Sequence, residues 1–534
     1  MSPSRVSSSA LAVAVGALVL GAAGCSGSGA ASTPTSTDRS VGSTAGLGQT
    51  ALDVMNLPPY SHATWAIRVS DAGSGDVLVD YNSNQFLEPA SVTKTYSTGA
   101  GWLKFGPDSR IVTPVVHTGK VAAGSLVGDL VLVAKGDITM GGQTGPGGTV
   151  VFTNMDHNDA NALPGATIAD NNPLAGLDQL AQQVKASGIS RVSGNVIIDD
   201  RLFKTKDLGE NDGPVSPIVI NNNLIDLVTA PTQPGQRAAV TMRPVVAPWT
   251  VDNRVQTVAA GGPSAIDVTS TRSGIITMIG TIAADSKPQL KVWHLTDPAT
   301  FARTAFIEAL KRAGVQVSAS ATAVNTTAGI GTESAVAALP QVAKLDGLTY
   351  DQNATYILKV SYNRGAQTQV CLLAVAAGSK DCDDGFPQMA TLFSQAGIDP
   401  LAASLIDGSG LPGNYITAAS QTQLETVFAH RPDAARWRAA LPTMGVDGSI
   451  ATVQADSPAK GQVSAKTGTL VSGDLMNNRL RLETKALGGY ITAKSGRQLA
   501  VAIIMNNAMF NDINGVFEAN DDLGKVAVSI WDSY

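Results

Sequence analysis

The sequence predicts a mixed α/β (α+β) protein, in which an antiparallel sheet flanked by helices is interrupted by a β-rich insertion. Alternating apolar and polar residues near both ends of the chain are typical of strands, and apolar stretches of helical length lie near them. Residues 108–345 consist mainly of short β-like runs separated by Gly and Pro. The chain has 534 residues, enough for two to four domains, and its 44% hydrophobic residues are sufficient for real cores.

Residues 1–24 have the features of an export signal. Arg5 is the only charged residue before Asp38, and residues 10–24 are apolar but too short and too rich in Ala and Gly for a comfortable membrane span. The segment ends in Leu-Gly-Ala-Ala-Gly-Cys25, which resembles a bacterial lipobox, although Ala22 stands where a larger aliphatic residue is usual. The resemblance implies a lipid on Cys25 and a lipoprotein of the cell envelope, exported to the outer face of the cytoplasmic membrane. Ordinary cleavage near Gly24, which would release a soluble protein, is the alternative.

Residues 25–55 are expected to form a flexible tether, because residues 26 to about 50 are rich in Gly, Ser and Thr. The formal net charge of −6 would repel a phosphate backbone, so nucleic acid is not expected as a partner. Besides Cys25, the chain has two cysteines, Cys371 and Cys382. An oxidising compartment would allow these two to form a disulfide, and two buried free thiols are the alternative.

The elements follow in order from their local patterns. Alternation around a Gly-rich turn predicts a hairpin at residues 64–69 and 77–81, and a helix is expected after Pro89-Ala90. One amphipathic helix is expected at 300–313 inside the insertion. In the last part of the chain, residues 354–361 and 368–377 are expected to be helical or buried. Residues 462–470, 489–493 and 499–505 are expected to form strands of one antiparallel sheet, and residues 516–531 a closing helix. These elements divide the chain into a catalytic domain at 56–107 and 346–534 and an inserted β-rich region at 108–345.

Three short motifs occur in a fixed order: SxxK at Ser91–Lys94, SxN at Ser361–Asn363, and KTG at Lys466–Gly468. A serine hydroxyl is a weak nucleophile that needs a nearby base. Three residues further along a helix, Lys94 shares a face with Ser91 and can reach its hydroxyl. A lysine acts as a base only when it is neutral, and burial together with a second cation such as Lys466 lowers its pKa. The motifs therefore predict an activated serine nucleophile at Ser91.

The remaining motif residues suit the binding of an extended peptide. We expect Ser361 to relay a proton to the leaving amine and Asn363 to hold a substrate amide. Lys466, Thr467 and Thr469 are placed to hold a C-terminal carboxylate, and the strand edge can pair with the substrate backbone. Gly468 is expected to make room for the substrate. Backbone N–H groups of Ser91 and Thr469 are the expected oxyanion hole.

Some copies of these patterns are decoys. Ser457–Lys460 is a second SxxK, but its internal Pro predicts a loop, and Ser193–Asn195 is a second SxN that leads directly into an expected strand. The five histidines are scattered without metal-ligand spacing, so neither a metal nor another cofactor is expected.

Taken together, the motifs are the signature of penicillin-binding proteins and class A β-lactamases. Most of residues 57–534 is similar to the S13 peptidase family, the D-Ala-D-Ala carboxypeptidases/endopeptidases also called class C low-molecular-mass penicillin-binding proteins. The long gap from Lys94 to Ser361 matches the domains inserted there in that family, and Tyr362 replaces the Asp usual in SxN. Further matching segments are EPASVTK at 88–94, GDL at 128–130, DGSGL at 407–411, GVDGS at 445–449 and KTGTL at 466–470. The segment 471–485, after KTGTL, is expected to lie between two strands and to reshape one wall of the cleft.

The resemblance implies a penicillin-binding/β-lactamase-like transpeptidase fold and an acyl-enzyme on Ser91. It also implies peptidoglycan stem peptides as substrates and β-lactam antibiotics as inhibitors. Two alternatives stay open. A β-lactamase of class A needs a deacylating Glu beyond SxN, and none occurs from Arg364 to Leu424. A non-catalytic cell-wall binding protein would not need the motif residues to be intact.

Overall fold

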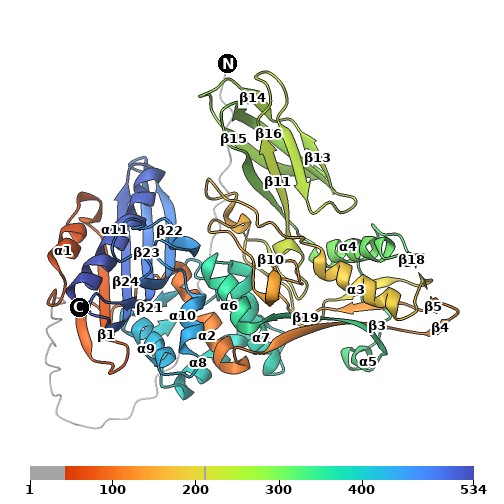
Figure 1. The fold of residues 1–534 in the computed structure, drawn as a ribbon, viewed down its shortest axis with the longest axis horizontal. Helices are drawn as coiled ribbons and strands as arrows, with labels where there is room; N and C mark the ends of the chain where they lie inside the picture. Colours follow the sequence, from red (N-terminus) through yellow and green to blue (C-terminus); the bar gives the residue numbers. More distant parts are fainter. Residues whose placement is uncertain (1–42, 210–211, 273) are drawn as a thin grey trace, which may run out of the picture. The chain divides into compact units, whose positions relative to one another are not determined.

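The computed structural model describes residues 43–209, 212–272 and 274–534 (Figure 1). The expected signal segment and Cys25 lie outside the described residues. A five-stranded sheet of order β2-β1-β24-β23-β22 combines the first two strands of the chain with the last three, and every neighbouring pair in it is antiparallel. Its strands are β1 (Thr64–Asp71), β2 (Val77–Tyr81), β22 (Val463–Asp474), β23 (Arg479–Thr492) and β24 (Gln498–Phe510).

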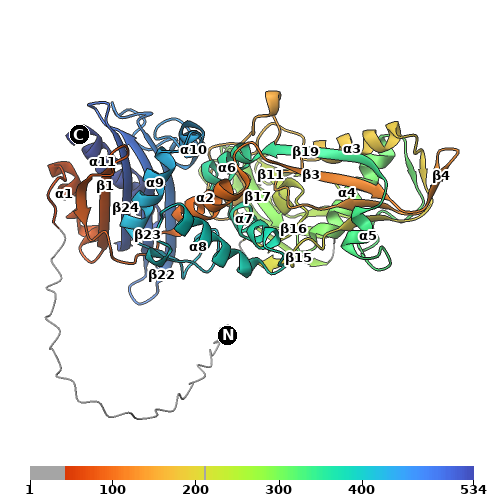
Figure 2. The same ribbon diagram turned by 90° about the horizontal axis from the view of Figure 1, so that it is seen from below.

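Alternation along the strands gives this sheet two apolar faces, because successive side chains of a strand point to opposite sides. Ile67 and Ile503 belong to one core with helices α1 (Gln49–Met55) and α11 (Ile513–Ser533). Their neighbours Ala66 and Ile504 belong to a second core on the other face. That core contains α2 (Lys94–Phe105), α6 (Tyr350–Lys359), α7 (Asn363–Ala376), α8 (Gly385–Gln395), α9 (Ala418–Ala429) and α10 (Ala434–Ala440). Figure 2 shows α9 across β1 and β24, so the predicted sheet flanked by helices is present.

The chain leaves this part of the molecule and returns to it on two paired strands. β3 (Arg110–His117) and β19 (Gln341–Thr349) are antiparallel, with Arg110 opposite Thr349. They form one sheet with β6 (Leu130–Val133) and β8 (Val196–Asp199). Helices α3 (Ala175–Ala186) and α4 (Pro298–Arg312) pack against each other beside it. The helix expected at 300–313 is therefore present as α4.

The other strands between β3 and β19 form smaller sheets. One consists of β4 (Lys120–Ala122), β5 (Ser125–Val127), β7 (Arg191–Val192) and β18 (Gln316–Val317). A second consists of β11 (Leu224–Ala230), β12 (Ala239–Arg243) and β17 (Gln289–His294). A third consists of β13 (Thr250–Asn253), β14 (Gln256–Val258), β15 (Ala265–Arg272) and β16 (Ile275–Ala283), and β9 (Lys206–Asp207) pairs with β10 (Pro214–Val215). This segment is thus rich in strands, as predicted.

The structure differs from the sequence expectations at two places. Helix α1 lies inside the segment 25–55 that we expected to be a tether, and its Ala51 and Val54 are buried. The segment 471–485 is not a connection between strands, because β22 continues to Asp474 and β23 already begins at Arg479. Residues 472–474 at the end of β22 have no apolar alternation, and the exposed tip of the hairpin carries Leu475 and Met476. Among the described residues, no helix is long and apolar enough to cross a membrane.

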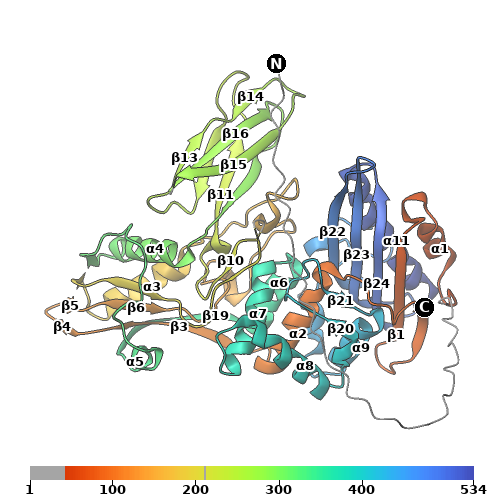
Figure 3. The same ribbon diagram turned by 180° about the vertical axis from the view of Figure 1, so that it is seen from behind.

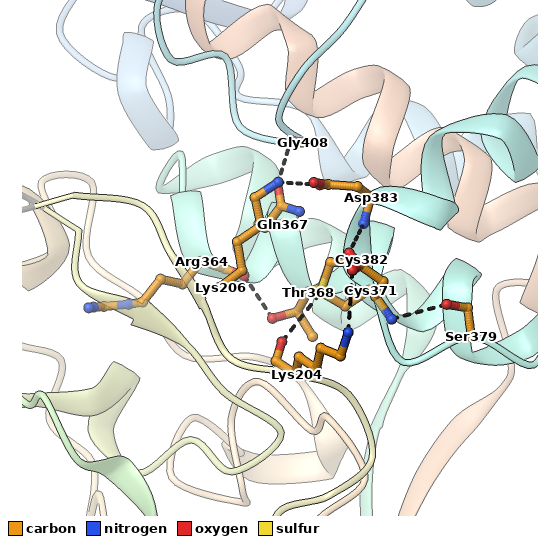
Figure 4. The surroundings of a disulfide bond; sticks show 11 residues. Lys204, Lys206, Arg364, Gln367, Thr368, Cys371, Ser379, Cys382, Asp383 and Gly408 are labelled. Atoms are coloured by element: carbon orange, nitrogen blue, oxygen red, sulfur yellow. Dashed lines mark hydrogen bonds and ion pairs between the residues drawn. A yellow bond between two sulfur atoms is a disulfide. The ribbon is translucent and has the colours of Figure 1, made fainter.

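A disulfide joins Cys371 on α7 to Cys382, which begins the short helix before α8. Both cysteines are buried. Figure 4 shows the surroundings of this disulfide. Gln367 lies one turn before Cys371 on α7, and its side-chain oxygen accepts a hydrogen bond from the backbone N–H of Gly408. The disulfide therefore ties down the helix that holds the loop around Gly408.

Candidate active site

The predicted nucleophile and its base lie at one helix start. Ser91 belongs to a single 3-10 turn (Ala90–Thr93), and the α-helix itself begins at Lys94. Lys94 Nζ donates a hydrogen bond to Ser91 Oγ at 2.7 Å. Ala90 has a positive φ of 47°, a strained conformation for a residue with a Cβ, of the kind that is concentrated at functional sites. The SxxK motif thus places an amine directly on the serine hydroxyl.

Lys94 is completely buried, with 0% of its surface exposed. Besides Ser91, its Nζ donates to the backbone oxygen of Ser409 at 2.7 Å. Asp407 fixes that loop by accepting hydrogen bonds from the backbone N–H groups of Ser409 and Gly410. Burial lowers the pKa of Lys94 to about 8, against the opposing effect of carboxylates that include Asp407. About one tenth of Lys94 is therefore neutral at pH 7 and about half at pH 8, and the neutral form can act as a base.

The other two motifs, SxN and KTG, are in direct contact with each other. Ser361 lies between α6 and α7 with a positive φ of 61°, and its Oγ accepts a hydrogen bond from Lys466 Nζ at 3.0 Å. Lys466 is also 0% exposed, and it donates to the backbone oxygen of Thr467 at 2.9 Å. Burial and the positive charge of Lys94 hold the pKa of Lys466 well below its usual value. Lys466 can reach Ser361 because β22, which carries Lys466, is the edge strand on the side of α6 (Figures 1 and 3).

Gly468 has a different role from the one we expected. A Cβ at this position would lie 2.1 Å from the backbone oxygen of Pro89. The missing side chain therefore makes room for the turn that carries Ser91, and not for the substrate. Gly410, with a positive φ of 96°, approaches the same turn, since its Cβ would lie 1.8 Å from the oxygen of Ala90. These two glycines allow β22 and the loop at 410 to close on the nucleophile.

The threonines of KTGT already have partners. Thr467 Oγ1 and Ser449 Oγ are 2.7 Å apart, and Thr469 Oγ1 accepts a hydrogen bond from Lys485 Nζ at 2.7 Å. Both threonines line the same cavity as Ser91. Thr467 and Thr469 therefore face the space in which a peptide would lie.

Asn363 is held by the inserted region. Its side-chain nitrogen donates to both carboxylate oxygens of Asp212, at 2.9 and 3.0 Å. It does not line the cavity that contains Ser91, and its expected contact with a substrate amide stays a prediction. The decoy motif behaves as expected: Ser457–Lys460 lies in a loop of turns, and Lys460 is exposed.

Ser91, Ser361, Thr467 and Thr469 line one cavity of about 380 Å³. Its lining combines hydroxyl groups, apolar side chains and two charged residues that the sequence did not single out, Asp159 and Lys485. The described residues that line it are Ser91, Asp159, Ala162, Leu163, Ser361, Ser449, Thr467, Thr469, Val471, Lys485, Ile513, Val516, Phe517 and Asn520. The two end residues of the segment 471–485, Val471 and Lys485, line this cavity, and the expected reshaping of its wall stays a prediction.

Asp159 reaches the cavity from the inserted region. The removal of water around its carboxylate and the neighbouring Asp156 raise the pKa of Asp159 to about 7, although Lys94 and Lys466 act in the opposite direction. A buried ion pair close by holds its short helix, because His157 Nδ1 lies 2.7 Å from the carboxylate of Asp226. Burial lowers the pKa of Lys485 to about 7. No local motif marks either residue, since only tertiary folding brings them beside Ser91.

Comparison with known proteins points in the same direction. The sequence pattern of the D-Ala-D-Ala carboxypeptidase 3 (S13) family matches residues 49–522. The D-alanyl-D-alanine carboxypeptidase of Actinomadura sp. (strain R39) is 25% identical over 481 residues, which are 85% of this chain and 79% of that protein. The carboxypeptidase DacB of Mycolicibacterium smegmatis is 34% identical over 125 residues, 22% of this chain and 25% of that one.

Solved structures share the fold. The crystal structure of penicillin binding protein 4 (dacB) from Haemophilus influenzae has a TM-score of 0.65 and 19% sequence identity, and the match covers 89% of this chain and 97% of that one. The same protein in complex with a β-lactam gives a TM-score of 0.63. The fold predicted from the sequence is therefore confirmed.

Proposed function

The chain belongs to the D-Ala-D-Ala carboxypeptidase 3 (S13) family, and on this premise we propose that it is a serine-type D-alanyl-D-alanine peptidase whose nucleophile is Ser91. Its substrates are peptidoglycan stem peptides, and β-lactams acylate the same serine. One observation carries the assignment of residues: two buried amines each contact a serine hydroxyl, Lys94 on Ser91 and Lys466 on Ser361, and both serines line one cavity.

Acylation begins when neutral Lys94 accepts the hydroxyl proton of Ser91 as Oγ attacks the carbonyl carbon of the penultimate D-Ala. A C–O bond forms, and the charge that develops on the carbonyl oxygen is stabilised by the backbone N–H groups of Ser91 and Thr469. The C–N bond then breaks, and the leaving amine receives a proton from Lys466 through Ser361. The two lysines together carry the same charge before and after, because one gains a proton and the other loses one.

Deacylation completes the cycle. A water molecule attacks the ester carbon and loses a proton, by way of Ser361, to Lys466, which acylation left neutral. The C–O bond to Ser91 then breaks as protonated Lys94 returns its proton to the serine oxygen. The first glutamate after Asn363 in the chain is Glu425, which is buried and accepts hydrogen bonds from Gln421 and Trp437. None of the described residues that line the cavity is a glutamate. We therefore expect a long-lived penicilloyl-enzyme, unlike that of a class A β-lactamase.

Lys485 adds a cation for the C-terminal carboxylate of the substrate. Lys485 lines the cavity and donates a hydrogen bond to Thr469. Thr467 and Thr469 also line the cavity. β22 is an edge strand, so an extended peptide paired to it would direct its end along these side chains. We assign carboxylate binding to Thr467, Thr469 and Lys485 together.

Labelling with a fluorescent penicillin tests the nucleophile, and the decoy motif supplies a matched control. Ser91→Ala should abolish labelling and D-Ala release, whereas Ser457→Ala should leave both unchanged. Retained labelling in Ser91→Ala would refute the assignment. Release of the label from the unaltered protein within seconds would favour a β-lactamase. The absence of both labelling and D-Ala release would favour a non-catalytic cell-wall protein.

Digestion of purified peptidoglycan with mass analysis separates the two possible activities. Release of free D-Ala measures carboxypeptidase activity, and loss of cross-linked dimers measures endopeptidase activity. We expect both to be absent in Ser91→Ala, because one acyl-enzyme serves both reactions.

We further propose that the protein is exported and anchored in the cell envelope by a lipid on Cys25. The Cys371–Cys382 disulfide supports an oxidising compartment, where such bonds persist. Growth of the producing cells with an alkyne-labelled fatty acid should label the protein, and Cys25→Ser should remove both the label and membrane sedimentation. Unlabelled protein that stays soluble would contradict the anchor.

A further inference from the structure

A loop at residues 443–449, between α10 and β22, reaches the cavity that contains Ser91. None of the three catalytic motifs lies in this loop, although it contains the segment GVDGS (445–449). Its last residue, Ser449, lines the cavity, and Ser449 Oγ lies 2.7 Å from Thr467 Oγ1. The loop therefore brings a second hydroxyl group to the place where we expect the carboxylate of the substrate.

The contact between the two hydroxyls determines what they can offer a ligand. Either oxygen can be the donor, so one of the two hydroxyl hydrogens is used between Ser449 and Thr467. The hydroxyl that accepts this bond keeps its own hydrogen for a ligand. Accepting a hydrogen bond also strengthens the one that the same hydroxyl donates. Ser449 and Thr467 thus act together as one donor for an acceptor in the cavity, such as a carboxylate.

Backbone hydrogen bonds hold the loop against the start of β22. The N–H of Met444 donates to the backbone oxygen of Val463 at 2.9 Å. The N–H of Ala465 donates to the backbone oxygen of Pro442, also at 2.9 Å. These bonds pair residues 442–444 with the three residues of β22 that directly precede KTG. The loop is therefore held in register with that motif.

A buried lysine fixes the loop from the other side. Lys359, the last residue of α6, is 4% exposed and lies two residues before Ser361. Its Nζ donates to Asp447 Oδ1 at 2.5 Å, and the same oxygen accepts the backbone N–H of Thr443 at 2.9 Å. The approach is close, since a Cβ at Gly448 would lie 3.0 Å from the backbone oxygen of Lys359. One ion pair thus links the helix that leads to SxN with the loop beside KTG.

We infer that Ser449 belongs to the site that binds the C-terminal carboxylate of the substrate, and that Lys359 is a positioning residue for it. This inference rests on the proposed peptidase function. Lys359 holds Asp447, and Asp447 holds the loop, so that Ser449 directs the hydroxyl of Thr467 at the carboxylate. Desolvation offsets much of the attraction in a buried ion pair. The contribution of this pair is therefore the placement of the loop.

Steady-state kinetics with a peptide ending in D-Ala-D-Ala, and with its C-terminal amide, test the inference. Ser449→Ala should lower kcat/KM for the free acid by about threefold to tenfold, mainly through KM, as for loss of one hydrogen bond. Lys359→Met should have a similar effect. Both losses should be smaller for the amide, whose oxygen carries no charge. Lys206→Met is the matched control, because Lys206 pairs with Asp383 and does not line the cavity, and it should leave both substrates unchanged.

The double variant separates positioning from general stability. If Lys359 acts through Ser449, adding Lys359→Met to Ser449→Ala should cost little more, because the effects of coupled residues are not additive. Losses that multiply, or an equal loss on the acid and the amide, would overturn the positioning role. An unchanged kcat/KM in Ser449→Ala would overturn the binding role, and this result does not depend on whether Lys359→Met folds. No release of D-Ala by the unaltered protein would overturn the proposed function, and this inference with it.

Discussion

The chain contains the pattern SxxK twice, and the two copies differ in the secondary structure and the burial of their lysines. Lys94 starts an α-helix, is completely buried and contacts Ser91 Oγ at 2.7 Å. Lys460 lies in a loop of turns and is exposed. Burial removes water from an amine and lowers its pKa, whereas an exposed ammonium keeps its hydration. The burial of the lysine, and not its spacing from a serine, therefore determines whether it can act as a base.

Removing the two lysines separately gives the largest expected contrast. Lys94→Met should slow acylation of Ser91 by about 10² to 10⁴-fold, the usual contribution of a general base. Lys460→Met should leave the rate within experimental error. The measurement is the second-order rate constant for acylation by a fluorescent penicillin. Equal rates in Lys94→Met and the unaltered protein would remove the base assignment.

Much of the fold could be predicted because strands and helices carry local periodic signals. The hairpin at β1 and β2 and the closing helix α11 follow from alternation and amphipathic spacing. The end of β22 was missed because residues 472–474 have no apolar alternation, and the start of β23 was missed although Leu480 and Leu482 alternate there with charged residues. Helix α1 was missed because a Gly- and Ser-rich segment precedes it, and its burial depends on contact with α11 at the far end of the chain.

The site shows the same limit more sharply. The motif lysines could be identified from spacing, but Asp159 and Lys485 have no motif, and they reach the cavity only through folding. The role of Gly468 was misjudged for a similar reason: its neighbour is the Pro89 carbonyl, which is distant in sequence. Sequence patterns therefore identify the reacting groups better than the groups that surround them.

Lys485 extends the comparison of Lys94 with Lys460 to a third lysine, which is buried, lines the cavity and belongs to no motif. Lys485→Met should lower kcat/KM for a peptide ending in D-Ala-D-Ala by about tenfold, through loss of one charge-assisted hydrogen bond to the carboxylate. The same peptide with a C-terminal amide should show little change. Because the pKa of Lys485 is about 7, the difference between the two proteins should be largest below pH 7 and fade above it. An equal loss on both peptides would indicate a structural role instead.

The smallest expected effect measures how far a nearby carboxylate opposes the lowering of the Lys94 pKa by burial. The Asp159 carboxylate stabilises the protonated form of Lys94, so it holds the pKa of that lysine higher than burial alone would. Asp159→Asn removes this influence, lowers the pKa of Lys94 and raises its neutral fraction at a given pH. The rise in penicillin acylation with pH, centred near 8 in the unaltered protein, should move to lower pH. We expect roughly twofold to fivefold faster acylation at a pH between about 7 and 8.

The pH range of this effect follows from Asp159 itself. Its pKa is about 7, so the carboxylate is charged above that pH and influences Lys94 there, and it is protonated below. Well above pH 8, Lys94 is neutral in both proteins and their rates should converge. Asp129→Asn is a control that removes a carboxylate outside the cavity lining, and it should leave the profile in place. A profile of Asp159→Asn that stays in place or moves to higher pH would show that Asp159 does not stabilise the charged lysine.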